Sequence, residues 1–397
     1  MKPGSKYHFL ILFSVTLLLA CAVAMTSTVL SVFIPYIKSE LSLSNTQASS
    51  ITTIRSFGAA VFILFVDKYI KRFGLRRAAF IGTLILAAAF FLFGVSRSYL
   101  PVCIASLLTG FGNSACGIVV CSIIVYKWFD TRKDFFLSIA SMGSGFAGIL
   151  CPPVVTHIIE TRSLAASLYF MSILIIILGA VTLVILRDSP EEYGIKAYND
   201  GARSAAKSYG GDASSVTMTC CFIAVFLIGL TCLSSGTLSA SLYRSVGFDP
   251  YIVSFAVSSM GIAIMISKII FGVIVDRKGS FTAYCVFCIC FSLGQIFNCL
   301  ANLMIVPLMF AGTFLGGMGT VLSTLGITTV SREFSSEETF TGKLKNFQFV
   351  YTIGGACSGL YVGTAADITG AYVRAWYGIL IMTLVMFALV ITAFRKR

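Results

Sequence analysis

Charged residues are scarce in this chain. Asp, Glu, Lys and Arg together make up 11 % of its 397 residues, whereas hydrophobic residues make up 57 %. Soluble globular domains contain about 25 % charged residues, so the composition excludes an ordinary soluble protein. The apolar stretches are instead long enough to cross a hydrocarbon layer of about 30 Å, which takes about 20 helical residues.

Residues that perform metal or nucleophilic chemistry are equally sparse. His8 and His157 are the only histidines, and they are too far apart in the sequence for a metal site. The 13 cysteines are scattered through apolar stretches, and close pairs such as Cys220–Cys221 lack the spacing of metal ligands. No nucleophile–base pair or phosphate-binding loop is evident. We therefore expect packing thiols, no metal, no cofactor and no enzyme activity.

What the chain does contain is a succession of apolar segments, and we predict twelve membrane-spanning helices and an all-α membrane fold. The predicted spans are residues 9–36, 46–66, 78–96, 100–126, 135–158, 164–186, 216–243, 251–275, 281–300, 304–330, 346–366 and 373–394. The first run is longer than the apolar core of a signal peptide, which has 7–15 residues. We interpret it as an uncleaved first span.

Positive charge is distributed unequally between the two sides of the predicted membrane. Of the 29 Lys and Arg residues, 22 fall on the side of the termini, five on the opposite side, and two inside spans. Such an excess marks the cytoplasmic side of a membrane protein. The net charge of +13 is therefore interpreted as a topology signal and not as a nucleic-acid site. We expect both termini in the cytoplasm and a bacterial inner-membrane location.

The sequence also indicates an internal duplication. Gly110 and Gly112 recur as Gly317 and Gly319, at an offset of 207 residues. Three such landmarks share nearly one offset: Asp67 with Asp276 at 209, the Gly110 pair at 207, and Gly143 and Gly148 with Gly354 and Gly359 at 211. We predict two pseudo-symmetric six-helix bundles, residues 1–187 and 216–397, joined by a polar cytoplasmic linker, residues 188–215. Transporters built from repeats bind substrate at the repeat interface.

Two cations lie inside the predicted spans. Arg55 interrupts the second span and Lys268 the eighth. A charge near the bilayer centre costs roughly 2.5–3.5 kcal/mol on insertion scales, and such residues usually face a water-filled cavity or a transport pathway. The alternatives are an Arg55 bonded to backbone carbonyls and a buried, neutral Lys268. Applying the 209-residue offset places Arg55 one helical turn from Lys268 on the equivalent helix, so we predict that both cations bind an anion.

The acidic residues do not accompany these cations. Glu40, Glu160, Asp249 and Asp367 are placed near the outer ends of spans, and the other acids in cytoplasmic loops or at their edges. Proton-coupled transport normally requires a titratable group in the pathway, and only His157 and Lys268 are near candidates. Exchange of one anion for another is the more economical hypothesis.

Twelve spans, a central loop and an acidic–basic loop signature in both halves (Asp67-Lys68 and Asp276-Arg277) resemble the major facilitator superfamily over essentially the whole chain. The resemblance implies the major facilitator fold and transport by alternating access. It also implies a cytoplasmic gate in which Asp67 and Asp276 pair with basic residues such as Arg132 and Arg277. The alternative is that these charges only set the topology.

Three stretches resemble one branch of that superfamily, the monocarboxylate transporters and oxalate–formate antiporters. They are Trp128-Phe129 with Arg132-Lys133 before the fifth span, Ser189-Pro190-Glu191-Glu192-Tyr193-Gly194 after the sixth, and Lys268 with Gly272 in the eighth. In that branch a span 8 cation holds the substrate carboxylate. The chain departs from the branch in other respects. Ile264 stands where proton-coupled members have an aspartate, and residues 346–366 lack the second cation of the oxalate carriers.

Arg55 is a candidate to replace that missing cation. Polar residues at similar depth could shape selectivity, and we include Asn113, Gln348 and Tyr351 in the predicted substrate site, although each could equally make an interhelical hydrogen bond. The hypothesis is a monomeric secondary transporter that exchanges small organic carboxylates. The alternatives are a proton-coupled monocarboxylate symporter, a drug/proton antiporter and a membrane sensor or scaffold.

Overall fold

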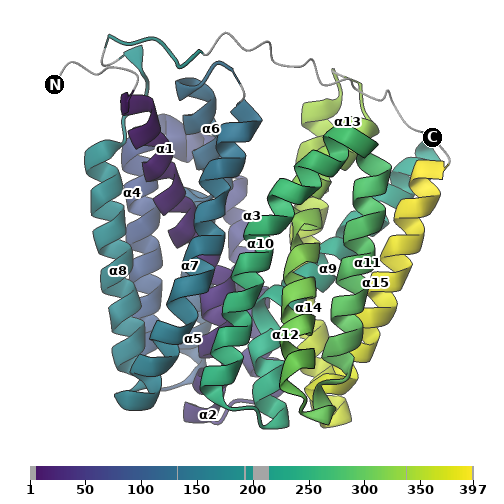
Figure 1. Ribbon diagram of the computed structural model, residues 1–397. Helices are drawn as coiled ribbons and strands as arrows, with labels where there is room; N and C mark the ends of the chain where they lie inside the picture. The colour runs from purple at the N-terminus through teal and green to yellow at the C-terminus, as the bar shows by residue number, and fades with distance from the viewer. Residues whose placement is uncertain (1–5, 132, 192–193, 200–213, 337, 396–397) are drawn as a thin grey trace.

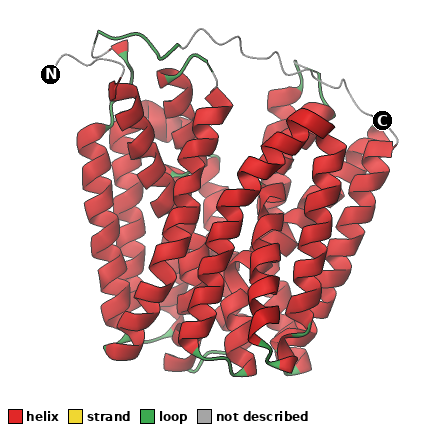
Figure 2. Ribbon diagram, in the orientation of Figure 1, coloured by secondary structure: helices red, strands yellow, loops and turns green. Residues whose placement is uncertain are grey.

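The apolar runs of the chain fold into helices in the computed structural model, which describes residues 6–131, 133–191, 194–199, 214–336 and 338–395. Figure 2 shows helices and connecting loops, with no strand among the described residues. The elements are α1 (Lys6–Leu19), η1 (Ala20–Val29), α2 (Leu30–Glu40), α3 (Asn45–Ile63), α4 (Val66–Val95), α5 (Tyr99–Cys116), α6 (Ile118–Trp128), α7 (Lys133–Thr161), α8 (Leu164–Ile185), α9 (Ser215–Val246), α10 (Pro250–Lys278), α11 (Ser280–Cys299), η3 (Ala301–Leu303), α12 (Val306–Gly319), η4 (Thr320–Ser323), α13 (Leu325–Glu333), α14 (Phe340–Thr369) and α15 (Tyr372–Arg395).

Local sequence signals explain where several of these helices begin and end. Ser44 and Gln47 form a reciprocal capping box at the start of α3, which satisfies two of the unpaired amides of a first turn. Asp249 accepts hydrogen bonds from the first turn of α10, where Pro250 occupies the first helical position. Gly247 ends α9 in the left-handed conformation, with φ of +105°, which glycine adopts without steric cost.

The predicted loop between the second and third spans is largely helical. Helix α4 begins at Val66 and continues across Gly74, whose φ of +73° and ψ of 165° break the helical path. The Asp188 carboxylate accepts the amide of Arg76 at 2.6 Å just beyond this break. A side chain at residue 74 would be strained and would also meet Asp188. Gly74 therefore allows the break in α4, and Asp188 binds an amide at the start of the helical turn that follows it.

Ten helical stretches among the described residues are long and apolar enough to cross a membrane. The two remaining predicted spans, residues 46–66 and 346–366, correspond to α3 and α14, which also form long helices. Both carry many Ser, Thr and Gly residues, and α3 carries Arg55. These two less apolar helices pack against each other, and this contact shields their polar faces from lipid.

The helices form two groups, α1–α8 and α9–α15. Most close helix pairs lie within a group, and the largest contacts between groups are α3 with α14 and α7 with α10, followed by α2 with α9. Figure 1 shows the two groups side by side, with the start of α1 and the end of α15 at the same end of the molecule. We call this the terminal end and the other the distal end. The helices of the two groups diverge toward the terminal end (Figure 1).

The glycines that indicated a duplication occupy equivalent contacts in the two groups. Gly143 packs on the backbone of Thr16 in α1, and its counterpart Gly354 packs on Phe226 in α9, 210 residues after Thr16. A side chain at either glycine would collide with the neighbouring backbone. Each glycine thus joins the fifth span of its group to the first.

The next pair of glycines makes the contacts between the groups. Gly148 of α7 faces Gly261 of α10, and its counterpart Gly359 of α14 packs against Ser49 and Thr52 of α3. A Cβ at Gly261 would lie 2.8 Å from the Gly148 carbonyl carbon. Small residues allow such backbone approaches in membrane helices, and here they do so at equivalent positions of the two groups.

Regular helix is interrupted at three places inside the spans. Residues 20–29 form a π-helix, η1, in the first span. The fourth span breaks at Gly117, between α5 and α6. The tenth span tightens into the 3-10 helix η4 and breaks at Thr324, which is 207 residues after Gly117. The breaks of the fourth and tenth spans therefore follow the same offset as the glycines.

Candidate functional site

Arg55 lies deep inside the protein, in the middle of α3. Its side chain is 5 % exposed. The backbone of α5 reaches α3 at this residue because Gly110 contacts the Arg55 carbonyl, where any side chain would collide. The closely packed glycine therefore fixes the backbone from which the guanidinium extends.

The Arg55 guanidinium is incompletely paired. Its Nη1 donates to the Thr26 hydroxyl at 3.4 Å, and its buried Nε has no hydrogen-bond partner. No carboxylate pairs with Arg55 in the part of the chain that the structure describes. A buried charged donor left unsatisfied costs about 1–3 kcal/mol or more. An anion bound to the Arg55 guanidinium would remove this cost.

Tyr351 approaches Arg55 from the other helix group. The two side chains are close enough to interact electrostatically, and Ser323 of η4 is also near the Tyr351 side chain. Arg55 belongs to α3 and Tyr351 to α14, the pair with the largest contact between the groups. The predicted site residues Arg55 and Tyr351 are thus brought together across this contact.

Lys268 lies at the other main contact between the groups. It projects from α10, is half-buried, and donates from Nζ to the Ser141 carbonyl of α7 at 3.0 Å. Gly272, one turn later on the same face, faces open space. No interaction joins Lys268 to Arg55 among the residues described. The two cations therefore occupy separate contacts in this conformation.

The remaining predicted substrate residues are half-buried. Gln348 precedes Tyr351 by one turn on α14, and residues three apart lie on one helix face. Asn113 follows Gly110 by one turn on α5, next to Ser114, whose hydroxyl donates to the Ala59 carbonyl of α3 at 3.0 Å. Gln348 therefore shares a face of α14 with Tyr351, and Asn113 follows the residue of α5 that contacts the Arg55 backbone.

The predicted outer-end acids lie at helix ends of the distal end. Glu160 accepts the Tyr36 hydroxyl at 2.6 Å, Asp249 caps α10, and Glu40 pairs with Arg97 at 3.5 Å. Asp367 of α14 accepts the backbone amides of Asn45 at 3.0 Å and Thr46 at 2.8 Å, at the start of α3. Each of these acids has a structural partner away from the two intramembrane cations.

Several of these distal contacts join the two helix groups. Besides Asp367 at the start of α3, the Arg244 guanidinium of α9 lies 5.4 Å from the centre of the Tyr36 ring. Lys38 of α2 lies 5.5 Å from the centre of the Tyr372 ring of α15. Exposed cation–π contacts contribute about 0.5–1 kcal/mol each. Together these interactions hold the distal ends of the groups against each other.

The predicted cytoplasmic gate maps to the terminal end. Asp67 lies in the first turn of α4 and Arg277 in the last turn of α10, both with exposed side chains. Arg132 and the side chain of Asp276 lie outside the described residues. Within the described part, neither Asp67 nor Arg277 forms an ion pair. Pairing in this gate stays a prediction for another conformation.

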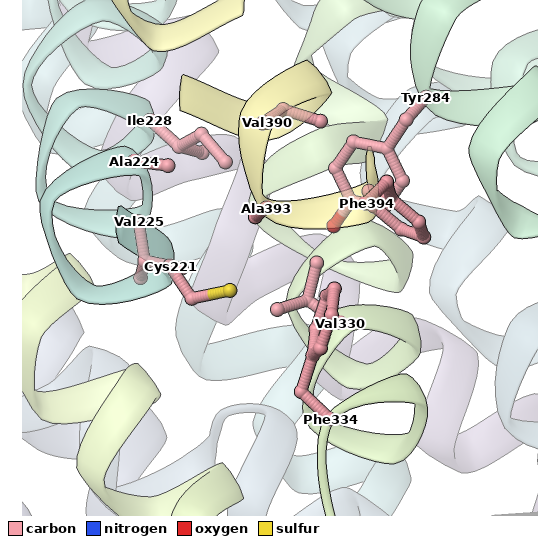
Figure 3. Close-up of a pocket in the computed structure, with 10 residues that line it drawn as sticks. All are labelled: Cys221, Ala224, Val225, Ile228, Tyr284, Val330, Phe334, Val390, Ala393 and Phe394. Atoms are coloured by element: carbon pink, nitrogen blue, oxygen red, sulfur yellow. The ribbon is translucent and has the colours of Figure 1, made fainter. Parts of the chain in front are cut away.

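A separate apolar pocket lies between α9, α11, α13 and α15. It is lined by aliphatic and aromatic residues such as Ile228, Tyr284 and Phe334, together with Cys221 (Figure 3). The space inside it is about 10 Å³, far below the roughly 300–1,000 Å³ of ligand pockets. Neither Arg55 nor Lys268 borders it, so it is not part of the candidate site. The described residues contain no cluster of metal-ligating side chains.

Two residues beside the Arg55–Tyr351 pair were missed from the sequence. Thr26 and Ser323 are common hydroxyl residues in apolar stretches, and hydroxyls in membrane helices usually bond to their own backbone. Both in fact do so. The bond from Arg55 to Thr26 depends on the π-helical segment that carries Thr26, for which the sequence offers no signal.

The fold and these contacts can now be set beside known proteins. The model of the Major Facilitator Superfamily matches residues 16–342. The chain belongs to this superfamily. Membership in this transporter superfamily identifies the chain as an integral membrane protein. The predicted fold is confirmed, and so is the resemblance to the monocarboxylate transporter branch at the level of distant relatives.

Several relatives and one solved structure illustrate how distant the similarities are. Monocarboxylate transporter 12 of Mus musculus is 25 % identical over 329 residues, 75 % of this chain and 67 % of that protein. The uncharacterized protein Cj0987c of Campylobacter jejuni is 30 % identical over 159 residues, 38 % of this chain; the match spans about half (46 %) of that relative's length. The structure of the nucleoside transporter NupG superposes with a TM-score of 0.72 at 14 % identity, covering 98 % of this chain and 99 % of that one.

In a major facilitator of this fold, the contact between the two halves is the expected place for a substrate. Transporters built from repeats bind their substrates near the membrane midplane at the repeat interface. Arg55 and Tyr351 lie on α3 and α14, the helices that form the largest contact between the two groups. This superfamily member thus has a buried, incompletely paired cation at the interface of its halves.

Proposed function

We propose that this transporter moves small organic carboxylates, by exchange of one anion for another. The observation that carries the proposal is the buried Arg55 guanidinium, whose Nε lacks a partner, on a helix, α3, that packs against α14 of the opposite half. A guanidinium presents paired N–H groups that match the two oxygens of a carboxylate. Thr26 occupies Nη1, which leaves the edge formed by Nε and Nη2 for such a ligand.

Lys268 supplies the second cation of the proposed site. Its Nζ donates to one carbonyl, although an ammonium group has three donors. Release of Lys268 from Ser141 would let it bind a second carboxylate or the same ligand after movement of α10 against α7. Asn113, Gln348 and Tyr351 would provide the polar groups that select among carboxylates.

The placement of charge supports exchange of one anion for another over net transport of a single anion. An empty site leaves a cation buried without an anion, and this raises the free energy of reorienting the empty carrier. A bound carboxylate neutralises that charge. The described acids of the distal end are engaged at helix ends, away from the cations, so they are not placed to couple transport to a proton. Proton-coupled monocarboxylate symport is the second candidate, and drug/proton antiport the third.

The other expectations from the sequence belong to the same proposal. They are bundles of residues 1–187 and 216–397 joined by residues 188–215, termini in the cytoplasm, a bacterial inner-membrane location and function as a monomer. The equivalent glycine contacts of the two groups support the bundle organisation.

The test is counterflow in proteoliposomes with labelled mono- and dicarboxylates and their uncharged amides. We expect carboxylates to exchange and amides not to. Exchange of amides or of cationic drugs with no carboxylate exchange would overturn the proposal. A pH jump without internal substrate separates the modes: uptake driven by the proton gradient alone would favour symport over exchange.

A further inference from the structure

The turn between the second and third spans is longer than its counterpart in the other half. Gly74 and Gly279 interrupt the two chains with nearly the same backbone angles, φ of 73° and 86° and ψ of 165° and 164°. These glycines are 205 residues apart, whereas Asp67 and Asp276 are 209 apart. Between the acid and the glycine, the first half therefore has four more residues, about one helical turn.

The inner face of this longer turn is fixed to the protein. The centre of the Tyr69 ring lies 5.2 Å from that of Phe62 in α3 and 5.4 Å from that of Phe73. The Tyr69 hydroxyl donates to the Ala78 carbonyl at 2.6 Å, beyond the break in α4. Val66, one turn before Tyr69, is 5 % exposed. These contacts determine which face of the turn points away from the protein.

The outer face carries three cations, which we call the basic face: Lys68, Lys71 and Arg72. All three side chains are exposed, and their spacing of three and four residues places them on one side of the helix. Arg72 lies 5.8 Å from the centre of the Phe73 ring. Among the described residues, no carboxylate forms an ion pair with the basic face. Like charges at this spacing repel each other, and an anion bound between them would remove that repulsion.

The basic face lies where a span leaves the apolar part of the membrane. The first span begins at the terminal end with α1 (Figure 1), so α3 returns to that end and the turn into α4 lies there. Leu64 and Phe65, directly before the cations, are 63 % and 54 % exposed. Exposed apolar side chains next to exposed cations are typical of a segment that lies at a membrane interface.

We propose that the basic face binds the headgroup phosphate of an anionic phospholipid in the leaflet at the terminal end. Lys68, Lys71 and Arg72 contact the phosphate, while Leu64 and Phe65 contact the acyl chains. Each Lys or Arg beside an anionic membrane surface strengthens the association about fivefold. The proposal is independent of the transported substrate, because neither Arg55 nor Lys268 takes part in it.

Quenching of a tryptophan introduced by Phe65→Trp tests this proposal. The two native tryptophans, Trp128 and Trp376, are fully buried, so quenchers on lipid chains reach mainly the new one. The protein is reconstituted in phosphatidylcholine vesicles with a minor fraction of phosphatidylglycerol, and the acyl chains of one lipid or the other are brominated. We expect phosphatidylglycerol to quench at least about fivefold more per lipid than phosphatidylcholine. Adding Lys68→Gln, Lys71→Gln and Arg72→Gln together should bring this ratio close to one.

Two controls separate the basic face from the general surface charge. Arg277→Gln with Lys278→Gln removes two exposed cations from the corresponding turn of the other half, and we expect the ratio at Phe65→Trp to stay unchanged. Leu100→Trp places the reporter at a position of α5 that is 70 % exposed, at the distal end. There we expect the two lipids to quench equally.

The outcomes distinguish a lipid site from charges that only set the topology. If the triple variant keeps the preference for phosphatidylglycerol, or if Arg277→Gln with Lys278→Gln lowers it equally, the proposal is wrong. An equal preference at Leu100→Trp would also overturn it. If the triple variant does not insert into the membrane, Lys71→Gln with Arg72→Gln keeps Lys68 and should still remove most of the preference.

Discussion

The two main contacts between the halves differ in what they contain. The α3–α14 contact is polar: the Thr53 hydroxyl accepts the Leu360 amide at 3.1 Å, and Arg55 lies buried beside it without a full set of partners. The α7–α10 contact consists of closely packed glycines, with the Ser258 hydroxyl on the Ile149 carbonyl at 2.9 Å. Lys268, the cation of this contact, donates a hydrogen bond from Nζ in α10 to the Ser141 carbonyl in α7.

This difference assigns different roles to two cations that look alike in the sequence. Arg55 has a buried donor, Nε, with no partner, so a ligand can bind it without replacing an existing bond. Lys268 already ties α10 to α7, so a ligand must first replace the Ser141 carbonyl. We therefore expect Arg55 to dominate recognition, and Lys268 to contribute less to affinity and more to the balance between conformations.

The largest effect is expected for Arg55→Gln, which keeps hydrogen-bonding groups but removes the charge. Carboxylate counterflow at subsaturating substrate should fall roughly 100-fold, the equivalent of about 2.7 kcal/mol, within the range for hydrogen bonds to charged groups. Arg97→Gln is the control, because Arg97 is an exposed arginine at the distal end. If Arg55→Gln and Arg97→Gln exchange carboxylate at equal rates, the proposed difference between the α3–α14 and α7–α10 contacts is wrong.

Lys268→Met should have a smaller effect. Methionine keeps the apolar stem and removes the bond to Ser141, and we expect the KM for carboxylate to rise about tenfold or less. Spin-label distances across α7 and α10 should broaden, because the tie between the halves is lost. A loss of affinity larger than that of Arg55→Gln would reverse the assignment of roles.

The smallest effect is expected at the distal end of the α3–α14 contact. Asp367→Ala removes the carboxylate that caps α3 from the opposite half, and loss of a helix cap costs about 1 kcal/mol. Hydrogen exchange at the amides of Asn45 and Thr46 should therefore accelerate about fivefold. Exchange should also accelerate in α2, whose distal end contacts the other half.

Asp249→Ala provides the matched comparison for this variant. Asp249 caps α10 within its own half, so its removal should speed exchange at the start of α10 and leave α2 and α3 unchanged. If each variant speeds hydrogen exchange only in the helix that it caps, Asp367 is an ordinary helix cap and does not help to hold the two halves together.

Much of this architecture could be predicted from the sequence, because lipid imposes strong rules on composition. Long apolar runs had to become helices, and the repeated glycines at offsets of 207 and 211 mark contacts that the structure shows to be equivalent. Arg55 and Lys268 are conspicuous because a charge in an apolar run is costly. Such signals are local or periodic, so they can be recognised without coordinates.

The details of the candidate site could not be predicted in this way. The bond from Lys268 to the Ser141 carbonyl involves a backbone group, which any residue supplies. The π-helix around Thr26 and the 3-10 helix around Ser323 carry no local sequence signal. The Asp367 cap on α3 joins residues more than 300 positions apart. Each depends on how the two halves meet, which the sequence does not express.

The most direct test of the central role of Arg55 is equilibrium binding of a transported carboxylate to the purified protein. The comparison is between wild type, Arg55→Gln, Arg55→Lys and Lys268→Met, with the uncharged amide as a second ligand. We predict that Arg55→Gln binds the carboxylate at least about tenfold more weakly and that Arg55→Lys restores little, because lysine lacks the paired N–H geometry. Wild-type affinity in Arg55→Gln, or equal binding of the amide and the carboxylate by the wild type, would contradict the account.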